Sequence, residues 1–376
     1  MNWYLLLEWV IKGAVLVFGL LFGFMYLTWM ERKTLGRMQT RFGPNRAGPF
    51  GLFQPFADAI KLIFKEEFMP AQAQKTIFIL APIITVIPAV IVAAVIPWGQ
   101  DVTLFGHPVT LYVADLNVGI LYITAITSIA VYGITLAGWS SNNKYALLGG
   151  LRSTAQMISY ELALSLTFIT AIVLSGSMRT LDIVNEQSTM WFAVIQPVGA
   201  LIFLVATLAE VNRAPFDMPE AEQELASGYN VEYGGMKFAL IFMAEYIKMI
   251  TISAIAATLY FGGFREFWFL DGTWFSVDVH PWLGPIYLIL KIIVLLFVMI
   301  WVRATLPRIR YDRLMAFGWK VLLPLSLGMA FLSAAGVLLA QEVNRNLIWL
   351  IPVVSLLVGG FAVAMVNRSL WRKLYA

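Results

Sequence analysis

The fold is decided by stretches such as residues 76–97, which read TIFILAPIITVIPAVIVAAVIP and contain no charged side chain. At a rise of about 1.5 Å per residue, a helix over this stretch is long enough to cross the roughly 30 Å hydrocarbon core of a bilayer. Similar apolar runs recur along the whole chain. The sequence therefore predicts several helices that span a membrane.

The composition leads to the same class. Hydrophobic residues make up 60% of the 376 positions and charged residues 13%, whereas soluble domains average about 45–50% and about 25%. Long unbroken apolar runs exclude a transmembrane β-barrel, whose strands alternate over about ten residues. We predict an all-α polytopic membrane protein that forms a single domain over residues 1–376, with nine spans at about 5–30, 76–97, 117–138, 155–175, 191–210, 238–261, 284–303, 321–340 and 347–366.

Basic residues are unevenly divided between the two sides of this predicted bundle. The segments after spans 1, 3, 5 and 7 and the C-terminal tail hold 20 of the 26 Lys and Arg, and the opposite side holds 4. Because the positive side faces the cytoplasm or an organelle's interior, we predict an outer N-terminus and an inner C-terminus. The first 30 residues lack a basic leader and a small-residue cleavage site, which predicts a retained span. The net charge of +4 needs no nucleic-acid partner.

Cysteine and histidine are too scarce for the usual redox centres. The chain has no cysteine and only two histidines, His107 and His280, so it offers no thiolates for an iron–sulfur cluster and no bis-histidine haem site within the membrane. Both histidines are interpreted as ordinary loop residues, and we predict no metal site. If redox chemistry occurs, a partner supplies the electrons.

Three carboxylates fall inside or at the end of consecutive predicted spans, which favours a path for protons or ions because ionisable groups are expensive in hydrocarbon. Glu161 lies roughly 10 Å deep at 1.5 Å per residue, Glu245 lies at a similar depth, and Glu210 closes the fifth span. The alternative is that Glu245 and Lys248, three residues apart on one helical face, only neutralise each other. Lys291 is either a charge relay or a structural counter-ion.

An acidic loop over residues 211–237 follows Glu210. Its carboxylates Asp217, Glu220 and Glu224 are spaced to cluster on one side of a helix that begins after Pro219, with Glu222 between them. Neighbouring negative charges raise carboxyl pKa values, so such a cluster can hold and release protons near neutral pH. A solvated acidic face is the alternative.

The segment after the first span is basic and leads into an amphipathic stretch, residues 49–68. Phe53, Phe56, Ile60 and Phe64 share one helical face there, which predicts an interfacial helix. The basic residues anchor to anionic lipid headgroups in one interpretation. In the other, a gap beside this helix admits a ligand carried in the lipid.

Eight motifs in order make the sequence resemble the H-subunit family of NADH:quinone oxidoreductase, respiratory complex I, over roughly residues 30–325. They are MERK at 30–33, RFGPNR at 41–46, QPFADAIK at 54–61, LNVG at 116–119, AGWSSNNKY at 137–145, the stretch 152–161, NRAPFDMPEAE at 212–222 and RATLPRIRYD at 303–312.

The resemblance implies a quinone chamber framed by the first span and the amphipathic helix, and a buried acidic chain that leads from the chamber towards antiporter-like subunits. Matching positions that line or shape the chamber are Glu31, Arg32, Arg41, Arg46, Asp58, Lys61 and Arg303, with Phe216 beside it on the acidic loop. The acidic chain corresponds to Glu161, Glu210, Glu220, Glu222, Glu224 and Glu245, with Asp217 and Glu232 beside it.

The resemblance also implies the reaction and its partners. Quinone is the substrate, and FMN and iron–sulfur clusters reside in partner subunits. Those partners are the iron–sulfur and quinone-site subunits of a peripheral arm and the antiporter-like and small subunits of a membrane arm. The expected location is a bacterial inner membrane. Two features depart from the shortest family members, a ninth span and a longer loop over 262–283, and we expect peripheral packing roles for both. The third span also lacks an acidic residue within 117–138.

Other functional classes remain as alternatives. A membrane subunit of an energy-converting hydrogenase shares the acidic path and need not bind quinone, but the basic segment and amphipathic helix favour the quinone enzyme. A stand-alone cation transporter is expected to show inverted repeats or paired interrupted helices, which the sequence lacks. A passive scaffold leaves the carboxylates within the spans without a purpose.

Overall fold

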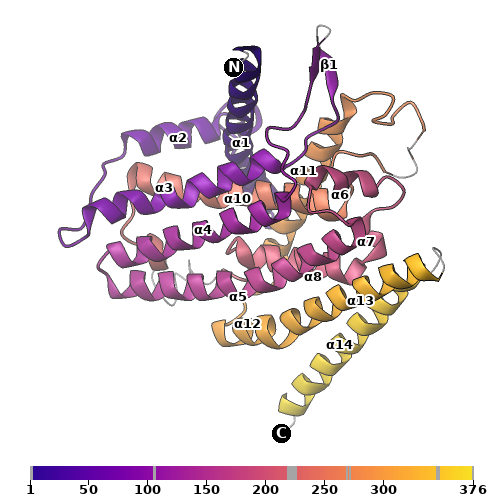
Figure 1. The fold of residues 1–376 in the computed structure, drawn as a ribbon. Coiled ribbons are helices and arrows are strands. Elements are labelled where there is room, and N and C mark those ends of the chain that lie inside the picture. Colours follow the sequence, from indigo (N-terminus) through magenta and orange to yellow (C-terminus); the bar gives the residue numbers. More distant parts are fainter. Residues whose placement is uncertain are drawn as a thin grey trace.

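The computed structural model is an almost entirely helical protein (Figure 1). It describes residues 3–104, 107–217, 227–267, 270, 272–343 and 348–374. Among these, seven helices or helix runs are long and apolar enough to cross a membrane. They are α1 (Trp3–Met38), α3 (Lys75–Val92), α4 (Gly119–Ser140), α5 (Lys144–Ser175), α10 (Gly235–Tyr260), α11 (Leu283–Thr305) and the run of α12 (Tyr311–Phe317), the π-turn Gly318–Leu322 and α13 (Leu323–Glu342).

Two shorter apolar helices correspond to the remaining predicted spans. One is α8 (Pro197–Glu210), and the other is α14 (Leu350–Leu374), which is apolar over Leu350–Met365. The predicted span over 191–210 is divided into α7 (Phe192–Ile195) and α8, because Gln196 leaves the helical region and Pro197 has no N–H for a helical bond. The Gln196 side chain donates to the carbonyl of Met329 and to Ser333, so α13 supports the break.

The smaller elements lie at the ends of the long helices. The predicted amphipathic stretch forms a 3₁₀ turn, Pro49–Gly51, and the helix α2 (Gln54–Phe64), which packs on α1 through an edge-to-face pair of Phe22 and Phe56. At the opposite end of the bundle lie α6 (Thr180–Glu186) and a hairpin of β1 (Val102–Leu104) and β2 (His107–Val109), which pairs Val102 with Val109. The 3₁₀ turns Ala93–Val95 and Gly228–Asn230 complete the described elements.

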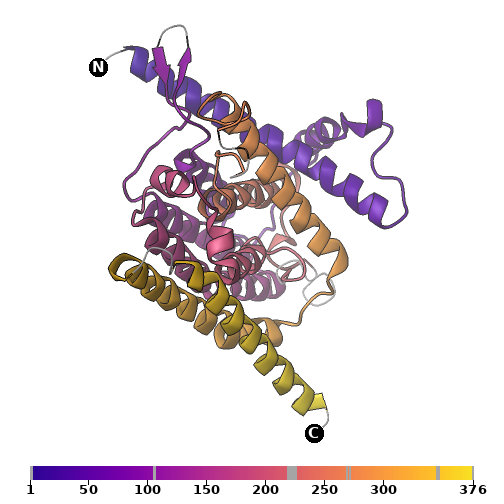
Figure 2. The same cartoon turned by 90° about the vertical axis from the view of Figure 1, so that its right-hand side faces the viewer.

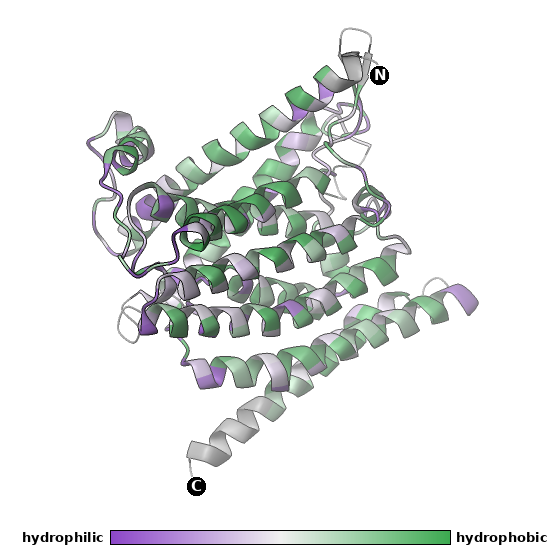
Figure 3. Cartoon of the chain, turned by 60° about the vertical axis from the view of Figure 1, so that its left-hand side comes forward, coloured by the Kyte–Doolittle hydropathy of each residue, from purple (hydrophilic) through white to green (hydrophobic). Residues whose placement is uncertain are grey.

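Helices α3, α4 and α5 lie side by side, whereas α1 and the pair of α13 and α14 lie on opposite sides of the bundle (Figures 1 and 2). Of the residues in the most apolar 18-residue stretch of each helix, 61% are buried inside the chain in α10, but only 11% in α1. The hydropathy colouring shows apolar residues along both faces of these helices (Figure 3), as expected when the outer face meets lipid. Helix α10 is therefore the centre of the bundle, and α1 lies at its edge.

Close helix contact is achieved through small residues. A Cβ placed on Gly133 of α4 would lie 2.4 Å from Thr85 Cγ2 and 3.0 Å from the Ala81 carbonyl of α3. Only glycine fits at this contact, which is the usual device for packing helices in membranes. The contact fixes α3 against α4, and both line the cavities described below.

Candidate functional site: a chain of buried ion pairs

One arginine joins two carboxylates from different helices at the centre of the protein. Nη1 of Arg213 donates to Oε1 of Glu31 at 2.9 Å, and its Nε lies 2.6 Å from Oε1 of Glu245. Glu31 comes from α1 and Glu245 from α10. Glu31 also pairs with Arg303 from the end of α11, and the guanidinium of Arg213 stacks over the ring of Tyr246 at 4.3 Å. We call Glu31, Arg213, Glu245 and Arg303 the arginine cluster.

Two residues of this cluster, Glu31 and Arg213, are shielded from solvent. Glu31 and Arg213 are 3% and 5% exposed, so breaking their pair would leave an uncompensated charge in a low-dielectric environment. Burial alone would lower the pKa of Arg213, but the carboxylates of Glu245 and Glu31 hold it above the ordinary value for arginine. Arg213 therefore stays charged, and it links α1 to α10 electrostatically.

The turn that presents Arg213 is held by Gln156 of α5. Its Nε2 donates to the carbonyls of Ala209 at 2.9 Å and Phe216 at 2.7 Å, on either side of the turn. Asn212 has a positive φ of 55°, which reverses the chain directly after α8. The Ala209 carbonyl also accepts from the backbone N–H of Asn212 at 3.2 Å. The Gln156 side chain thus ties the end of α8 to the far side of the turn, which fixes the guanidinium between the two carboxylates.

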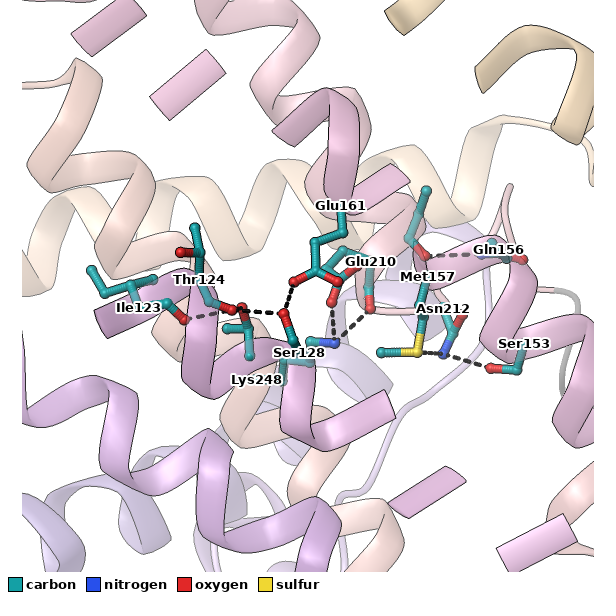
Figure 4. Close-up of polar contacts among 12 residues, drawn as sticks. Ile123, Thr124, Ser128, Ser153, Gln156, Met157, Glu161, Glu210, Asn212 and Lys248 are labelled. Carbon is teal, nitrogen blue, oxygen red and sulfur yellow. Dashed lines mark hydrogen bonds and ion pairs between the residues drawn. The ribbon is translucent and has the colours of Figure 1, made fainter. Parts of the chain in front are cut away.

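Lys248, Glu210 and Glu161 form a second group of charges (Figure 4). Lys248 of α10 donates to Oε1 of Glu210 at 2.7 Å and to the Glu210 carbonyl at 2.9 Å. Glu161 of α5 accepts a hydrogen bond from Ser128 of α4 and interacts electrostatically with Glu210. The structure thus brings together the three carboxylates predicted within the spans, Glu161, Glu210 and Glu245.

The suggested neutralisation of Glu245 by Lys248 is not what the structure shows. The two side chains are close in sequence, but Lys248 pairs with Glu210 and Glu245 pairs with Arg213. The reason is tertiary: α8 ends beside α10 and offers Lys248 both a carboxylate and a helix-terminal carbonyl, to which a cation is attracted. Glu245 is thereby left for the arginine.

A cavity of about 40 Å³ lies between the two groups of charges. Its lining includes Glu210, Glu245, Lys248 and Asn212. Two acceptors at this site, Oε2 of Glu210 and Oδ1 of Asn212, have no hydrogen-bond partner among the described residues. A cavity needs about 10–15 Å³ for one water and polar atoms to hold it, so this cavity suits a short chain of ordered water.

A smaller cavity of about 20 Å³ lies on the other side of Lys248, between α3, α4 and α10. Thr127 and Thr251 are the other polar residues of its lining. Lys248 and Ala130 are the residues that line both cavities.

The predicted chamber residues fall into separate places. Arg32 pairs with Asp58 of α2 at 2.6 Å, and Lys61 lies 3.7 Å from the same carboxylate. Arg41 and Arg46 are exposed on the segment between α1 and α2. Arg303 joins the arginine cluster. The ring of Phe216 is buried against Tyr160.

The acidic loop is described only at its ends. Asp217 is the last residue of its first described part, and Glu220, Glu222 and Glu224 lie outside the described residues. Glu232, in the second described part, accepts a hydrogen bond from Asn143 at 2.8 Å, which attaches this segment to the start of α5. The grouping predicted for these loop carboxylates stays a prediction.

Sequence reasoning missed Arg213, and the partner that its alternative interpretation gave to Lys248 is not the one observed. The signal for Arg213 was present, because an arginine three residues after a span-ending glutamate is close enough to pair with buried acids. Lys291, which the sequence left open, donates to the carbonyls of Gly263 and Arg265 at 2.8 and 2.6 Å, close to the face of Trp191. It therefore anchors part of the 262–283 loop to α11.

The fold and these charges define a class: a polytopic helical membrane protein with a chain of ion pairs inside its bundle. A family model described as NADH dehydrogenase matches residues 11–334. Three relatives are each named as an H subunit of NADH-quinone oxidoreductase. The relative from Syntrophobacter fumaroxidans is 47% identical, and the match covers 88% of this chain and 96% of the relative. The relative from Thermomicrobium roseum is 49% identical, with 87% of this chain and 95% of the relative covered. The relative from Geobacter metallireducens is 50% identical, with 84% and 92% covered in the same order.

The chain belongs to the H-subunit family of NADH-quinone oxidoreductase, which confirms the resemblance found in its motifs. It is therefore a multi-pass membrane subunit of respiratory complex I, and the other subunits of that complex are its partners.

Proposed function

We propose that this subunit forms part of the quinone-binding chamber and couples quinone reduction to proton translocation through its buried carboxylates. The observation that carries the proposal is the shared guanidinium of Arg213. It binds Glu31, whose neighbour Arg32 belongs to the predicted chamber, and Glu245, which lies at the cavity with Glu210. A charge that appears in the chamber therefore acts on the carboxylate path through one rigid ion-pair group.

The chamber side is supported by the contacts of α1 and α2. Arg32 and Asp58 pair across these two elements, and Trp29 and Lys33 of α1 donate to the Phe50 carbonyl of the segment that joins them. The amphipathic helix is thus held against α1 by polar groups. This arrangement suits an opening through which a lipid-soluble quinone enters from the bilayer.

The coupling step follows from electrostatics. When the quinone takes up electrons, the negative charge competes with Glu31 for Arg213 and Arg303, and Glu245 and Glu210 experience the change. Moving one charge across 100 mV requires about 2.3 kcal/mol, and a pKa change of one corresponds to about 1.36 kcal/mol. A field that changes the pKa of a carboxyl on the path by about two therefore supplies enough free energy to move one proton across 100 mV.

Partner subunits complete the reaction. This chain has no cysteine to ligate an iron–sulfur cluster. In line with the family resemblance, we assign the clusters and the FMN to partner subunits of the peripheral arm, which passes electrons to the quinone. The antiporter-like and small membrane-arm subunits receive the proton or charge signal from the carboxylates. The proposed location is a bacterial inner membrane with the N-terminus outside and the C-terminus in the cytoplasm. The hydrogenase alternative is disfavoured, because the three relatives are named as quinone oxidoreductase subunits.

The test uses the assembled complex in inverted membrane vesicles with Glu161→Gln and Glu210→Gln. Both variants should reduce NADH-driven quinone reduction and proton uptake by at least about tenfold, while NADH oxidation by ferricyanide stays normal because it requires only the partner's flavin. Glu342→Gln, an exposed carboxylate at the end of α13, is the matched control. Normal proton uptake in both path variants would refute the proposal.

A further inference from the structure

Lys248 occupies a position in the carboxylate path that the motifs did not assign. Its Nζ has three N–H donors, and two of them point to the same residue, the carboxylate and the carbonyl of Glu210. Glu210 is 1% exposed and Lys248 is largely buried. Lys248 therefore holds its charge against a single buried carboxylate.

The two cavities meet at this lysine. The first contains the unpaired acceptors of Glu210 and Asn212, and the second contains the hydroxyls of Thr127 and Thr251. Each hydroxyl already donates to backbone carbonyls, Thr127 to Ile123 and Thr124, and Thr251 to Ala89 and Ile247. Their lone pairs are consequently available to accept from an ammonium group or from water.

The second cavity lies within reach of the lysine side chain. Thr251 follows Lys248 by three residues on α10, which places both on the same face of the helix. Thr127 faces them from α4. The flexible four-carbon side chain of Lys248 therefore has two sets of acceptors near it. The carboxylate of Glu210 lies at the first cavity, and the hydroxyls of Thr127 and Thr251 lie at the second.

We propose that Lys248 is a movable positive charge that connects the two cavities and acts as a positioning residue through Glu210. This inference rests on the proposed proton-coupling function. While Glu210 is ionised, it holds Nζ at the first cavity. When a hydronium ion in that cavity gives a proton to Oε2 of Glu210, the attraction is lost, and Nζ turns to the hydroxyls of Thr127 and Thr251. Nζ keeps its three protons throughout. One O–H bond of the hydronium breaks as the O–H bond of Glu210 forms, and neutral water is left in the cavity.

The consequence is that protonation of Glu210 moves a charge towards α3 and α4. When Nζ returns to Glu210, its positive charge favours the carboxylate, and the proton passes from Oε2 to a water molecule in the first cavity, which becomes hydronium. Glu161 faces the same groups from α5 and Glu245 from α10, so the position of Nζ affects all three carboxylates.

The test compares Lys248→Met and Lys248→Arg with Lys320→Met, a lysine exposed on the π-turn before α13, in the assembled complex. Lys248→Met should lower the kcat of NADH-driven quinone reduction and proton uptake at least about tenfold without changing the quinone KM, and Lys248→Arg should recover a large part. Ferricyanide reduction, normalised to the amount of complex on native gels, should be normal in all three. A kcat within twofold of wild type in Lys248→Met overturns the inference.

A double variant separates action through Glu210 from an independent effect. Glu210→Gln with Lys248→Met should be no slower than Glu210→Gln alone, because the lysine then has no carboxylate to follow. Multiplied losses contradict the inference. If Glu161→Gln and Glu210→Gln both pump normally, the proposed function itself fails. If they are inactive and Lys248→Met is normal, only the role of Lys248 fails.

A second pair of variants decides the question even if Lys248→Met does not assemble. Thr251→Val removes an acceptor of the second cavity, whereas Thr258→Val, on the same helix, removes a hydroxyl that bonds to the Ala254 carbonyl and does not line either cavity. Thr251→Val should slow quinone reduction about threefold or more relative to Thr258→Val. Equal rates in the two variants overturn the inference.

Discussion

Arg213 and Glu31 lie 182 positions apart in the sequence, yet Nη1 of the arginine is 2.9 Å from Oε1 of the glutamate, and both side chains are almost completely buried. The pair connects the turn after α8 with α1, which has the smallest buried share among the seven candidate membrane spans of the described residues. The edge helix is thus attached to the centre by charge as well as by apolar packing.

Replacing Arg213 by Gln should destabilise the subunit strongly. Glu31 and Glu245 would both lose a buried partner, and removing one member of a buried pair typically costs about 3–5 kcal/mol. The thermal stability of the purified complex and the amount of assembled subunit measure the effect. Arg310→Gln is the control, because its pair with Asp312 is 77% and 69% exposed and such pairs contribute about 0–1 kcal/mol. Equal stability of the two variants would contradict a structural role for the arginine cluster.

Replacing Arg32 by Gln should impair quinone binding and leave assembly intact. Its pair with Asp58 is half-exposed at the arginine, so its contribution to stability is small, about 0–1 kcal/mol. If the pair shapes the chamber, the quinone KM should rise several-fold with a smaller change in kcat. Steady-state kinetics with a short-chain quinone measure both constants, with Lys320→Gln as control. An unchanged KM would remove Arg32 from the chamber.

Replacing Gln156 by Leu should loosen the turn that carries Arg213. The carbonyls of Ala209 and Phe216 would lose the Nε2 donor, and Ala209 would keep only the N–H of Asn212. Loss of a partner by a buried polar group costs about 1–3 kcal/mol. We expect a lower unfolding temperature together with slower quinone reduction. Gln100→Leu, which removes a hydrogen bond to Asp278 near the surface, is the control and should change neither. A variant as stable and as active as this control would show that the turn is held by other contacts.

Replacing Gly133 by Ala should separate α3 from α4. The new Cβ would clash with Thr85 and the Ala81 backbone, and overpacking typically costs about 1–3 kcal/mol. Gly19→Ala in α1 is the matched control, since no neighbouring group among the described residues lies within 4 Å of the point where its Cβ would be. The fraction of monodisperse complex after heating compares the two, and a Gly133→Ala variant as heat-resistant as Gly19→Ala would refute the close contact.

The family was accessible from the sequence because long motifs such as NRAPFDMPEAE at 212–222 are specific in themselves. Helix α3 was accessible because an uncharged stretch of that length has no other stable arrangement in a bilayer than a helix. The break at Gln196 was missed, although Gln196 and Pro197 interrupt the apolar stretch over 191–210. The bonds that support the break come from α13 and are not visible in the sequence.

The sequence by itself determined which residues enter the membrane, and with them the carboxylates Glu161, Glu210 and Glu245, because hydropathy is a local property of the chain. Only the tertiary structure decided how the charges pair. Lys248 lies one helical turn from Glu245 but bonds to Glu210, and Arg213 bridges α1 and α10. In a low-dielectric interior each charge takes the partner that best replaces its lost hydration, and that choice depends on where distant helix ends meet.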